Sequence, residues 1–378
     1  MKISGRLTAG VALVAITLLG GAGMIGAQEK KTVKIAYVGP LTGPNTAMGI
    51  GTRNSLELAI REANASNALP FKLELVSETD DSKPSTGVAA VQKLCNDPDV
   101  VAASAHWNSP VALATIPYFQ QCGLLNLVSG ASVDDLTRQG VAEIARVNTP
   151  FAYLLPHLAK SLTADLKIMT IAIVKSRDAF GEAGSAGFIP EYQKLGGKVV
   201  AEEGYNVGDR DFTALLTKVR SLRPDAVYLS GLTTEAALVA RQMRQLGMQM
   251  PLIGHAGWQT STFIEAAGEA GEGAIVVTSL PFLKDLPGGE GFAKRYAEAN
   301  FKEPAEAYGP FGYAAGQVMV DLLKRYGADR KAIVKGVREP HDFETIFGKG
   351  KFDASGELQP KYVDMAVLKN RDWVPLRK

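Results

Sequence analysis

Short apolar strands that alternate with amphipathic helices constrain the fold of this 378-residue chain more than any other feature. Between residues 100 and 135 a strand, a tight loop and a helix start follow one another twice, with buried strands predicted at 100–104 and 124–127. Consecutive strands joined by helices run parallel, so their carboxyl ends lie at the same edge of a sheet. The same alternation begins again after residue 150, which predicts an α/β protein with two similar lobes.

Two helix N-termini are predicted at this sheet edge. Ser109 is expected to be the N-cap of one helix, with Pro110 at its first position, and Ser132 the N-cap of the next, with Asp135 three residues on. Unpaired N–H groups and the positive ends of two helix dipoles would then point into one crevice. This arrangement favours a small anionic ligand, most simply a carboxylate; the alternative is a pair of ordinary caps with no ligand.

The order of the later elements predicts how the two lobes are connected. Residues 148–150 and 278–281 are expected to be points where the chain passes between lobes. Three helices with no strands between them, at 290–300, 305–326 and 329–337, should pack back onto the first sheet. The predicted domains are 28–148 with 280–356 as the N-terminal lobe, and 149–279 with 357–378 as the C-terminal lobe.

The N-terminus has the composition of an export signal. Lys2 and Arg6 precede an uncharged apolar run at 7–19, and small residues lead up to Ala27. We expect cleavage after Ala27; an uncleaved membrane anchor is the alternative, which the glycines at 20–26 disfavour. Cleavage removes two of the 41 basic residues and leaves 39, equal to the 39 acidic residues. This balance argues against a nucleic-acid partner.

The two cysteines, Cys95 and Cys122, lie at the ends of predicted helices that flank the strand at residue 100. Because export permits disulfide formation, we predict that they are bridged; two buried thiols are the alternative. The four histidines are scattered and no zinc-binding spacing is present. We therefore predict neither a metal site nor a cofactor.

Several loose motifs occur in a specific order and spacing along residues 31–378. They are VKIAYVGPLTGP at 33–44, Asp80-Asp81, His106-Trp107-Asn108-Ser109, IAIV at 171–174, Phe180-Gly181-Glu182, Asp211-Phe212, Asp225-Ala226-Val227-Tyr228, Gly271-Glu272-Gly273 and Tyr313-Ala314-Ala315. Together they resemble the branched-chain amino acid binding proteins, the periplasmic receptors of leucine/isoleucine/valine-type ABC importers. The resemblance implies the type I periplasmic binding fold, in which two lobes, each a parallel sheet flanked by helices, are joined by three crossovers and close on a ligand like a flytrap. It also implies a periplasmic monomer without catalytic activity that delivers its ligand to membrane permease subunits.

The resemblance further implies which residues bind the ligand. The ligand carboxylate would meet Ser109 and the turn formed by Gly130, Ala131 and Ser132. The other ligand-binding positions carried over from the family are Met48, Trp107, Asn108, Phe180, Leu232, Ala256 and Tyr308.

Three of these positions depart from the pattern of the family. Its amino acid binders have an acidic residue where Ala256 stands, which holds the ligand ammonium, and commonly tyrosine where Phe180 and Leu232 stand. A buried ammonium group without an anionic partner is costly. The family's ligand is an amino acid. Because this site lacks the acidic residue, the alternative ligand is an amine-free aromatic, fatty or keto carboxylate. Glu235 could supply the missing acid from another loop.

Two further functions remain open at the level of sequence. A hydrolase could use Ser109 or Ser132 as its nucleophile, but the Gly-x-Ser-x-Gly pattern is absent and no acid is evident that would orient His106. We therefore predict no catalytic residues. A sensor subunit that presents its closed lobes to a membrane kinase would use the same fold and pocket as an importer receptor.

Overall fold

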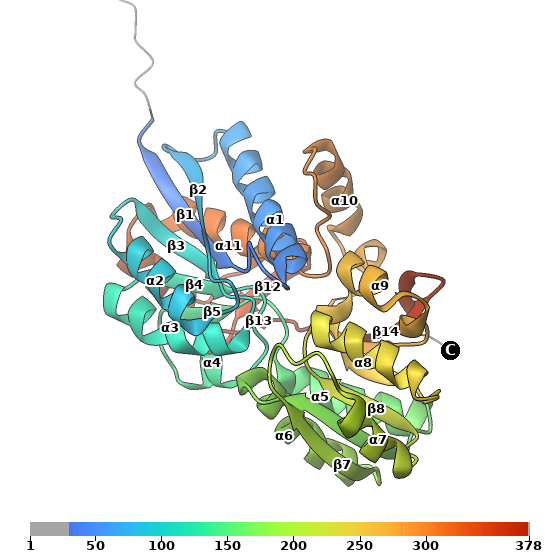
Figure 1. Cartoon of the computed structure of the whole chain (residues 1–378). Helices are drawn as coiled ribbons and strands as arrows, with labels where there is room; N and C mark the ends of the chain where they lie inside the picture. Colours follow the sequence, from blue (N-terminus) through green and yellow to red (C-terminus); the bar gives the residue numbers. More distant parts are fainter. Residues whose placement is uncertain (1–29, 281, 377–378) are drawn as a thin grey trace, which may run out of the picture. The chain divides into compact units, whose positions relative to one another are not determined.

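In the computed structural model, which describes residues 30–280 and 282–376, the first strands form a five-stranded parallel sheet, sheet A (Figure 1). Its strands are β1 (Thr32–Gly39), β2 (Lys72–Thr79), β3 (Val100–Ala105), β4 (Leu125–Val128) and β5 (Ile144–Arg146), in the spatial order β2–β1–β3–β4–β5. Every residue of β3 is buried, as expected for a parallel strand that is covered on both faces. The predicted signal peptide and its cleavage site after Ala27 lie outside the described residues.

Helices from both ends of the chain cover sheet A. They are α1 (Thr46–Ala65), α2 (Pro84–Cys95), α3 (Ser109–Cys122), α4 (Asp135–Arg138), α10 (Gly289–Glu298), α11 (Gly309–Tyr326) and α12 (Arg330–Gly336), with a 3-10 turn, η4 (Leu283–Asp285). Val33 and Ile35 of β1 pack with α1 and α11, whereas Ala36 and Val38 pack with α2 and α3, because successive side chains of a strand point to opposite faces. Since α11 and α12 contact sheet A and α10 contacts α1, the expectation that the late helices return to the first sheet is confirmed.

The second series of strands forms a seven-stranded sheet, sheet B. Its strands are β6 (Thr170–Ser176), β7 (Lys198–Tyr205), β8 (Ala226–Ser230), β9 (Leu252–His255), β10 (Ile275–Thr278), β14 (Asp364–Lys369) and β15 (Asp372–Pro375). The spatial order is β15–β14–β10–β9–β8–β6–β7, with β14 and β15 antiparallel to their neighbours. The five parallel strands repeat the order found in sheet A, so the two α/β series fold in the same way.

The helices of sheet B are also divided between its two faces. They are α5 (Phe151–Lys160), α6 (Ala179–Lys194), α7 (Thr213–Ser221), α8 (Thr233–Gln245) and α9 (Ser261–Ala267), with a π-helical turn η1 (Ser161–Asp165) and the 3-10 turns η2 (Ala256–Trp258) and η3 (Gly268–Gly271). Ile171 and Ile173 of β6 pack with α5 and α6, and Ala172 and Val174 pack with α7 and α8. The predicted α/β class with two helix-covered sheets is therefore confirmed.

The chain passes between the two sheets three times, as the resemblance implied: after β5, after β10 and before β14. The last passage follows a small antiparallel sheet that the sequence analysis did not predict, formed by β11 (Phe343–Thr345), β12 (Gly348–Phe352) and β13 (Leu358–Gln359). The sequences of these strands, FET, GKGKF and LQ, have neither an apolar run nor enough alternation to be recognised. The exact lobe boundaries proposed above stay a prediction.

The predicted disulfide joins Cys95 and Cys122, the last residues of α2 and α3. These helices lie side by side on one face of sheet A, and the two Cα atoms are 5.7 Å apart. The helix ends that carry the bridge are opposite to the end of α3 at which Ser109 lies.

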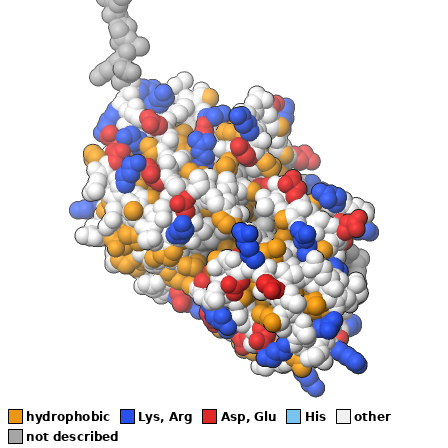
Figure 2. All heavy atoms as spheres, in the orientation of Figure 1, with side chains coloured by type: hydrophobic (Ala, Val, Ile, Leu, Met, Phe, Trp, Pro, Cys, Tyr) orange, Lys and Arg blue, Asp and Glu red, His pale blue; other side chains and the backbone are white. Residues whose placement is uncertain are grey.

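Charged side chains of both signs are interspersed over the face that Figure 2 shows, in line with the balanced composition. Across the described part of the chain, no helix combines the length and the apolar character that crossing a bilayer requires.

Candidate ligand-binding site

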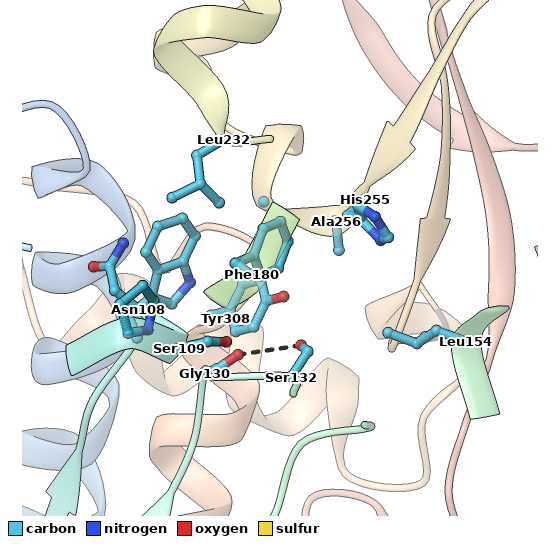
Figure 3. A pocket seen from close by; sticks show the side chains of 13 residues that line it. Asn108, Ser109, Gly130, Ser132, Leu154, Phe180, Leu232, His255, Ala256 and Tyr308 are labelled. Atoms are coloured by element: carbon cyan, nitrogen blue, oxygen red, sulfur yellow. Dashed lines mark hydrogen bonds between the residues drawn. The ribbon is translucent and has the colours of Figure 1, made fainter. Parts of the chain in front are cut away.

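A pocket lies where loops that follow strands of sheet A face loops that follow strands of sheet B (Figure 3). It is lined by Trp107, Asn108, Ser109, Pro110, Gly130, Ser132, Leu154, Phe180, Leu232, His255, Ala256, Gly257 and Tyr308. Ligands of parallel α/β folds bind at this edge, beyond the carboxyl ends of the strands. The pocket is thus in the place that the strand and loop pattern predicts.

All the predicted ligand-binding residues except Met48 and Ala131 line this pocket. Met48 and Ala131 are each 1% exposed and belong to two buried apolar clusters. Their contact with a ligand, like that of the other predicted residues, stays a prediction.

Four lining residues were missed by the sequence analysis: Pro110, Leu154, His255 and Gly257. Three of them are direct neighbours of predicted residues. The fourth, Leu154, lies on α5 and carries only the ordinary signal of a buried helical leucine.

The pocket wall from sheet A contains polar atoms that the protein leaves unused. Ser109 is 1% exposed, and its Oγ has no hydrogen-bond partner within the described residues. The same holds there for Nε1 of Trp107 and Oδ1 of Asn108. A buried polar group without a partner is costly, so these atoms are suited to hydrogen-bond a ligand.

The two helix starts at this wall differ from the prediction. Asn108, not Ser109, is the N-cap of α3, and Ser109 is the first helical residue. Ser132 caps no helix, because α4 starts at Asp135 and Asp134 precedes it as the N-cap. The predicted pair of serine caps is therefore wrong. Because Ser109 is not used as a cap, its hydroxyl is free to bind a ligand at the positive end of α3.

Side chains at the first crossover form hydrogen bonds to the backbone of the turn at residues 130–133. Arg146 is fully buried, and its Nη1 donates to the carbonyl oxygens of Ala131 at 3.2 Å and Val133 at 2.8 Å. Asn148 Nδ2 donates to the carbonyl of Gly130 at 3.1 Å. The backbone of this turn is therefore positioned by long-range hydrogen bonds and not by a helix cap.

Arg146 belongs to a buried ionic cluster that joins the first and last crossovers. Its Nε donates to Oε1 of Glu357 at 2.8 Å, and Nζ of Lys361 forms an ion pair with Oε2 of Glu357 at 2.8 Å. Although burial alone would raise the pKa of the Glu357 carboxyl, Lys361 and Arg146 hold it below its usual value. Burial lowers the pKa of Lys361 to about 8, against the attraction of Glu357.

Gly130 lies against Trp107. A methyl group on Gly130 would lie 2.6 Å from Cδ1 and 2.7 Å from Cα of Trp107, so only glycine allows this approach. Tyr308 packs edge-on against the indole ring, with 5.9 Å between ring centroids. Burial raises the pKa of Tyr308 to about 12, although the nearby Ser279 and Ser132 side chains lower it, so the phenol stays neutral.

The opposite wall comes from sheet B and is mostly apolar. Phe180 lies in the first turn of α6, whose N-cap Asp178 accepts a 2.9 Å hydrogen bond from the Gly181 N–H. Leu232 precedes α8, and Ala256 follows β9. In Figure 3, Phe180, Leu232 and Ala256 surround the cavity on the side away from Asn108 and Ser109.

The two walls meet at Trp107. A methyl group on Gly257 would lie 3.4 Å from Cζ2 of Trp107, which is an ordinary contact distance. Ala256 belongs to the same apolar cluster as Trp107 and Tyr308, and Leu232 packs against that cluster. The apolar surface around the pocket is therefore continuous between the two halves of the chain.

His255 is the buried polar residue of the sheet B wall. Its Nε2 is 2.7 Å from the Tyr228 hydroxyl, and its ring contacts Phe151 and Phe180 with centroids 5.2 and 5.4 Å away. Burial lowers the pKa of His255 to about 3, so the imidazole is neutral at physiological pH. Its Nδ1 has no hydrogen-bond partner among the residues that the structure describes.

The described residues that line the pocket include no aspartate or glutamate. Glu235, which the sequence left open as a substitute, is 7% exposed and accepts a 3.0 Å hydrogen bond from the Gly208 N–H outside the lining set. No carboxylate of the described lining residues therefore replaces the acidic residue that the family has at the position of Ala256.

His106 does have an orienting acid, contrary to the sequence analysis. Its Nδ1 donates to Oδ2 of Asp80 at 2.8 Å, and both side chains are fully buried. However, Nε2 of His106 and Oγ of Ser109 both lack a partner in the described structure, and His106 is not among the pocket residues. The hydrogen bond between nucleophile and base that a catalytic triad requires is thus absent between the described Ser109 and His106 side chains.

These features define a bilobal binding protein of the type I periplasmic class. The chain belongs to the periplasmic binding protein family, whose model matches residues 32–369. It is 29% identical to Leu/Ile/Val-binding protein homolog 1 of Brucella melitensis biotype 1, over 94% of each chain. It is 27% identical to the Leu/Ile/Val-binding protein BraC3 of Rhizobium johnstonii, over 86% of this chain and 89% of that protein. The resemblance stated from the motifs is confirmed.

Solved structures share the fold over almost the whole chain. The leucine binding protein LivK from Thermotoga maritima has a TM-score of 0.85 and 27% identity, over 91% of this chain and 98% of that structure. A solute-binding protein from R. palustris in complex with benzoate has a TM-score of 0.82 and 22% identity, over 91% of this chain and 95% of that structure. At 22% identity, the second comparison shows the fold alone.

Proposed function

We propose that this chain is the periplasmic receptor of an ABC importer and that it captures a small apolar carboxylate in the pocket between sheets A and B. The observation that carries the proposal is the buried, unused Ser109 hydroxyl at the first turn of α3, in a pocket whose other walls are mostly apolar. A hydroxyl donor at the positive end of a helix suits a carboxylate. After cleavage near Ala27, the receptor would act as a monomer and deliver its ligand to membrane permease subunits.

Binding would stabilise the closed arrangement because both halves of the chain contribute to the pocket. Ser109 and Gly130 follow strands of sheet A, whereas Phe180 and Ala256 belong to the half built on sheet B. A ligand shifts a conformational equilibrium only by its difference in affinity for the two states. A ligand that contacts both walls has that difference, and no chemical step is needed.

Two ligand classes fit this receptor. A branched-chain amino acid is supported by the names of the relatives, which are Leu/Ile/Val-binding proteins. An amine-free aromatic, fatty or keto acid is supported by the lining itself, because no carboxylate of the described pocket residues is placed to hold an ammonium group. The second candidate places the carboxylate at Ser109 and the apolar body against Phe180 and Leu232.

Thermal unfolding of residues 28–378 in the presence of leucine, isoleucine, valine, phenylalanine, benzoate, cinnamate and 4-methyl-2-oxopentanoate tests both candidates. A ligand at about one hundred times its Kd stabilises the folded state by about 2.7 kcal/mol, which raises Tm measurably. A shift with the amino acids alone selects the first class, and a shift with the amine-free acids alone selects the second. If no carboxylate raises Tm, the proposed function is wrong.

A further inference from the structure

The sheet B wall of the pocket contains a buried imidazole with one nitrogen in use and one unused. His255 is 4% exposed and is the last residue of β9. Nε2 is committed to the Tyr228 hydroxyl at 2.7 Å. Nδ1 is the unsatisfied nitrogen, and Figure 3 shows His255 beside Ala256 at the edge of the cavity.

The chemistry of this nitrogen depends on the tautomer. If the Tyr228 hydroxyl donates to Nε2, Nδ1 carries the proton and is a donor; if Nε2–H donates to Tyr228, Nδ1 is an acceptor. A ligand hydroxyl satisfies both cases, because it can donate and accept. A ligand carbonyl can pair with Nδ1 only when Nδ1 is the donor. A ligand ammonium group can pair with Nδ1 only when Nδ1 is the acceptor, and its buried charge would then have no anionic partner at this nitrogen.

The surroundings of His255 exclude a charged role for it. Phe151 and Phe180 pack against the ring, and Tyr228 is the titratable side chain that contacts it. Burial raises the pKa of Tyr228, so this partner is also neutral. A neutral imidazole in an apolar wall selects a neutral polar group.

We propose that His255 is a specificity-determining residue that binds a hydroxyl group of the ligand, so that the receptor prefers hydroxylated apolar carboxylates to their unsubstituted parent acids. This inference rests on the proposed function and adds the substrate class to it. Ser109 then binds the carboxylate and His255 the hydroxyl group of the ligand from opposite walls, with Phe180, Leu232 and Ala256 around its apolar part. Both contacts exist together only when the two walls face each other.

Calorimetric titration of the mature chain with matched acids tests the proposal. The pairs are benzoate with 4-hydroxybenzoate, and 4-methylpentanoate with 2-hydroxy-4-methylpentanoate; leucine is titrated beside the second pair. We expect the hydroxylated acid to bind about tenfold more tightly in at least one pair, as for one satisfied buried hydrogen bond. Equal affinity within both pairs would overturn the inference and leave the carboxylate receptor intact.

Two substitutions separate the nitrogens of His255. The amide of His255→Asn reaches the position of Nδ1, and that of His255→Gln the position of Nε2. We expect His255→Asn to retain the hydroxyl preference and His255→Gln to lose it while the parent acids still bind. The matched control is His157→Gln, a half-buried histidine on α5 outside the pocket lining, which should leave all affinities unchanged.

Each remaining outcome decides against the inference. If His255→Gln keeps the preference for hydroxylated acids, or if both variants lose affinity for all ligands equally, Nδ1 does not bind the ligand hydroxyl. If leucine binds more tightly than 4-methylpentanoate and 2-hydroxy-4-methylpentanoate, the pocket selects an ammonium group and not a hydroxyl group. If no acid binds to the unsubstituted chain, the proposed function fails and this inference fails with it.

Discussion

Arg146 Nη1 donates a 2.8 Å hydrogen bond to the carbonyl oxygen of Val133, and this bond links the first crossover to the turn that lines the pocket. The same guanidinium is paired with Glu357, 211 residues away in the sequence, just before β13 and the last crossover. Two of the three connections between the sheets therefore meet on one buried side chain. The backbone beside Ser132 is therefore positioned by side chains at the connections between the sheets.

Replacing Arg146 with methionine is expected to lower the free energy of unfolding by about 3 kcal/mol, because the buried carbonyls of Ala131 and Val133 lose their donor and Glu357 keeps only Lys361 as its charged partner. The affinity for ligand should fall as well, since the turn at 130–133 loses its support. Urea unfolding and titration measure the two effects. Arg138→Met is the matched control: Arg138 is an exposed residue paired with Asp134, so it should cost no more than about 1 kcal/mol.

Removing the Ser109 hydroxyl should weaken carboxylate binding about 10- to 150-fold, because a hydrogen bond to a charged group is lost. Stability should hardly change, since the hydroxyl makes no hydrogen bond within the described protein. Calorimetry on Ser109→Ala measures the affinity. Ser221→Ala is the control, because Ser221 is an exposed residue of α7. An unchanged affinity in Ser109→Ala would remove Ser109 from the site.

Alanine at position 130 should abolish tight binding, because its methyl group would displace the Trp107 side chain or backbone. Alanine at position 257 is the matched comparison on the opposite wall, where the methyl group would meet Trp107 at an ordinary contact distance. We expect Gly130→Ala to lose at least about tenfold more affinity than Gly257→Ala. Equal effects would show that the close approach of Gly130 to the indole does not matter.

Replacing Cys95 and Cys122 together with serine should reduce the free energy of unfolding by about 3–4 kcal/mol, as expected for a bridge between residues 27 apart. Ligand affinity should be retained because the bridge lies at the ends of α2 and α3 away from the pocket. The denaturation midpoint of the unsubstituted chain with and without a reducing agent provides the comparison. A loss of affinity that exceeds the loss of stability would contradict this separation.

The buried His255 should make the protein sensitive to mild acid. Its pKa is about 3 when folded and about 6.5 when unfolded, so below pH 6.5 the unfolded chain binds a proton that the folded chain excludes. Stability from this residue is complete above pH 6.5 and is lost as the pH falls toward 3, by about 2 kcal/mol at pH 5. The stability difference between the unsubstituted chain and His255→Phe should therefore shift in favour of the variant between pH 7.5 and pH 5; a constant difference would show that His255 is accessible to protons.

The sheets and their helices could be predicted because their signals are local. The residues of β3 are small or apolar throughout, and Pro84 and Pro110 mark the starts of α2 and α3. The cysteine pair followed from the same reasoning, since two helices on either side of one strand end at Cys95 and Cys122. The alternation of strands and helices and the disulfide therefore needed no information from distant parts of the chain.

The detailed geometry of the site could not be obtained in this way. Ser132 followed by Asp135 has the spacing of a helix start, but Arg146 and Asn148 hold the preceding backbone in a turn instead. The partner of Arg146 is Glu357, and no local pattern connects two residues so far apart. His255 was overlooked because a histidine at the end of a buried strand has no sequence signal that separates packing from binding.

The position of Trp107 gives the molecule an intrinsic optical reporter. Its indole belongs to the sheet A half, but Gly257 of the other half lies against its far edge. Of the three tryptophans, Trp258 is fully buried and bonded to the Gly231 carbonyl, and Trp373 packs on Phe263, both within the sheet B half. Separation of the halves would hydrate the Trp107 indole, whereas Trp258 would stay buried, so a red shift of the emission spectrum would record the open population without a label.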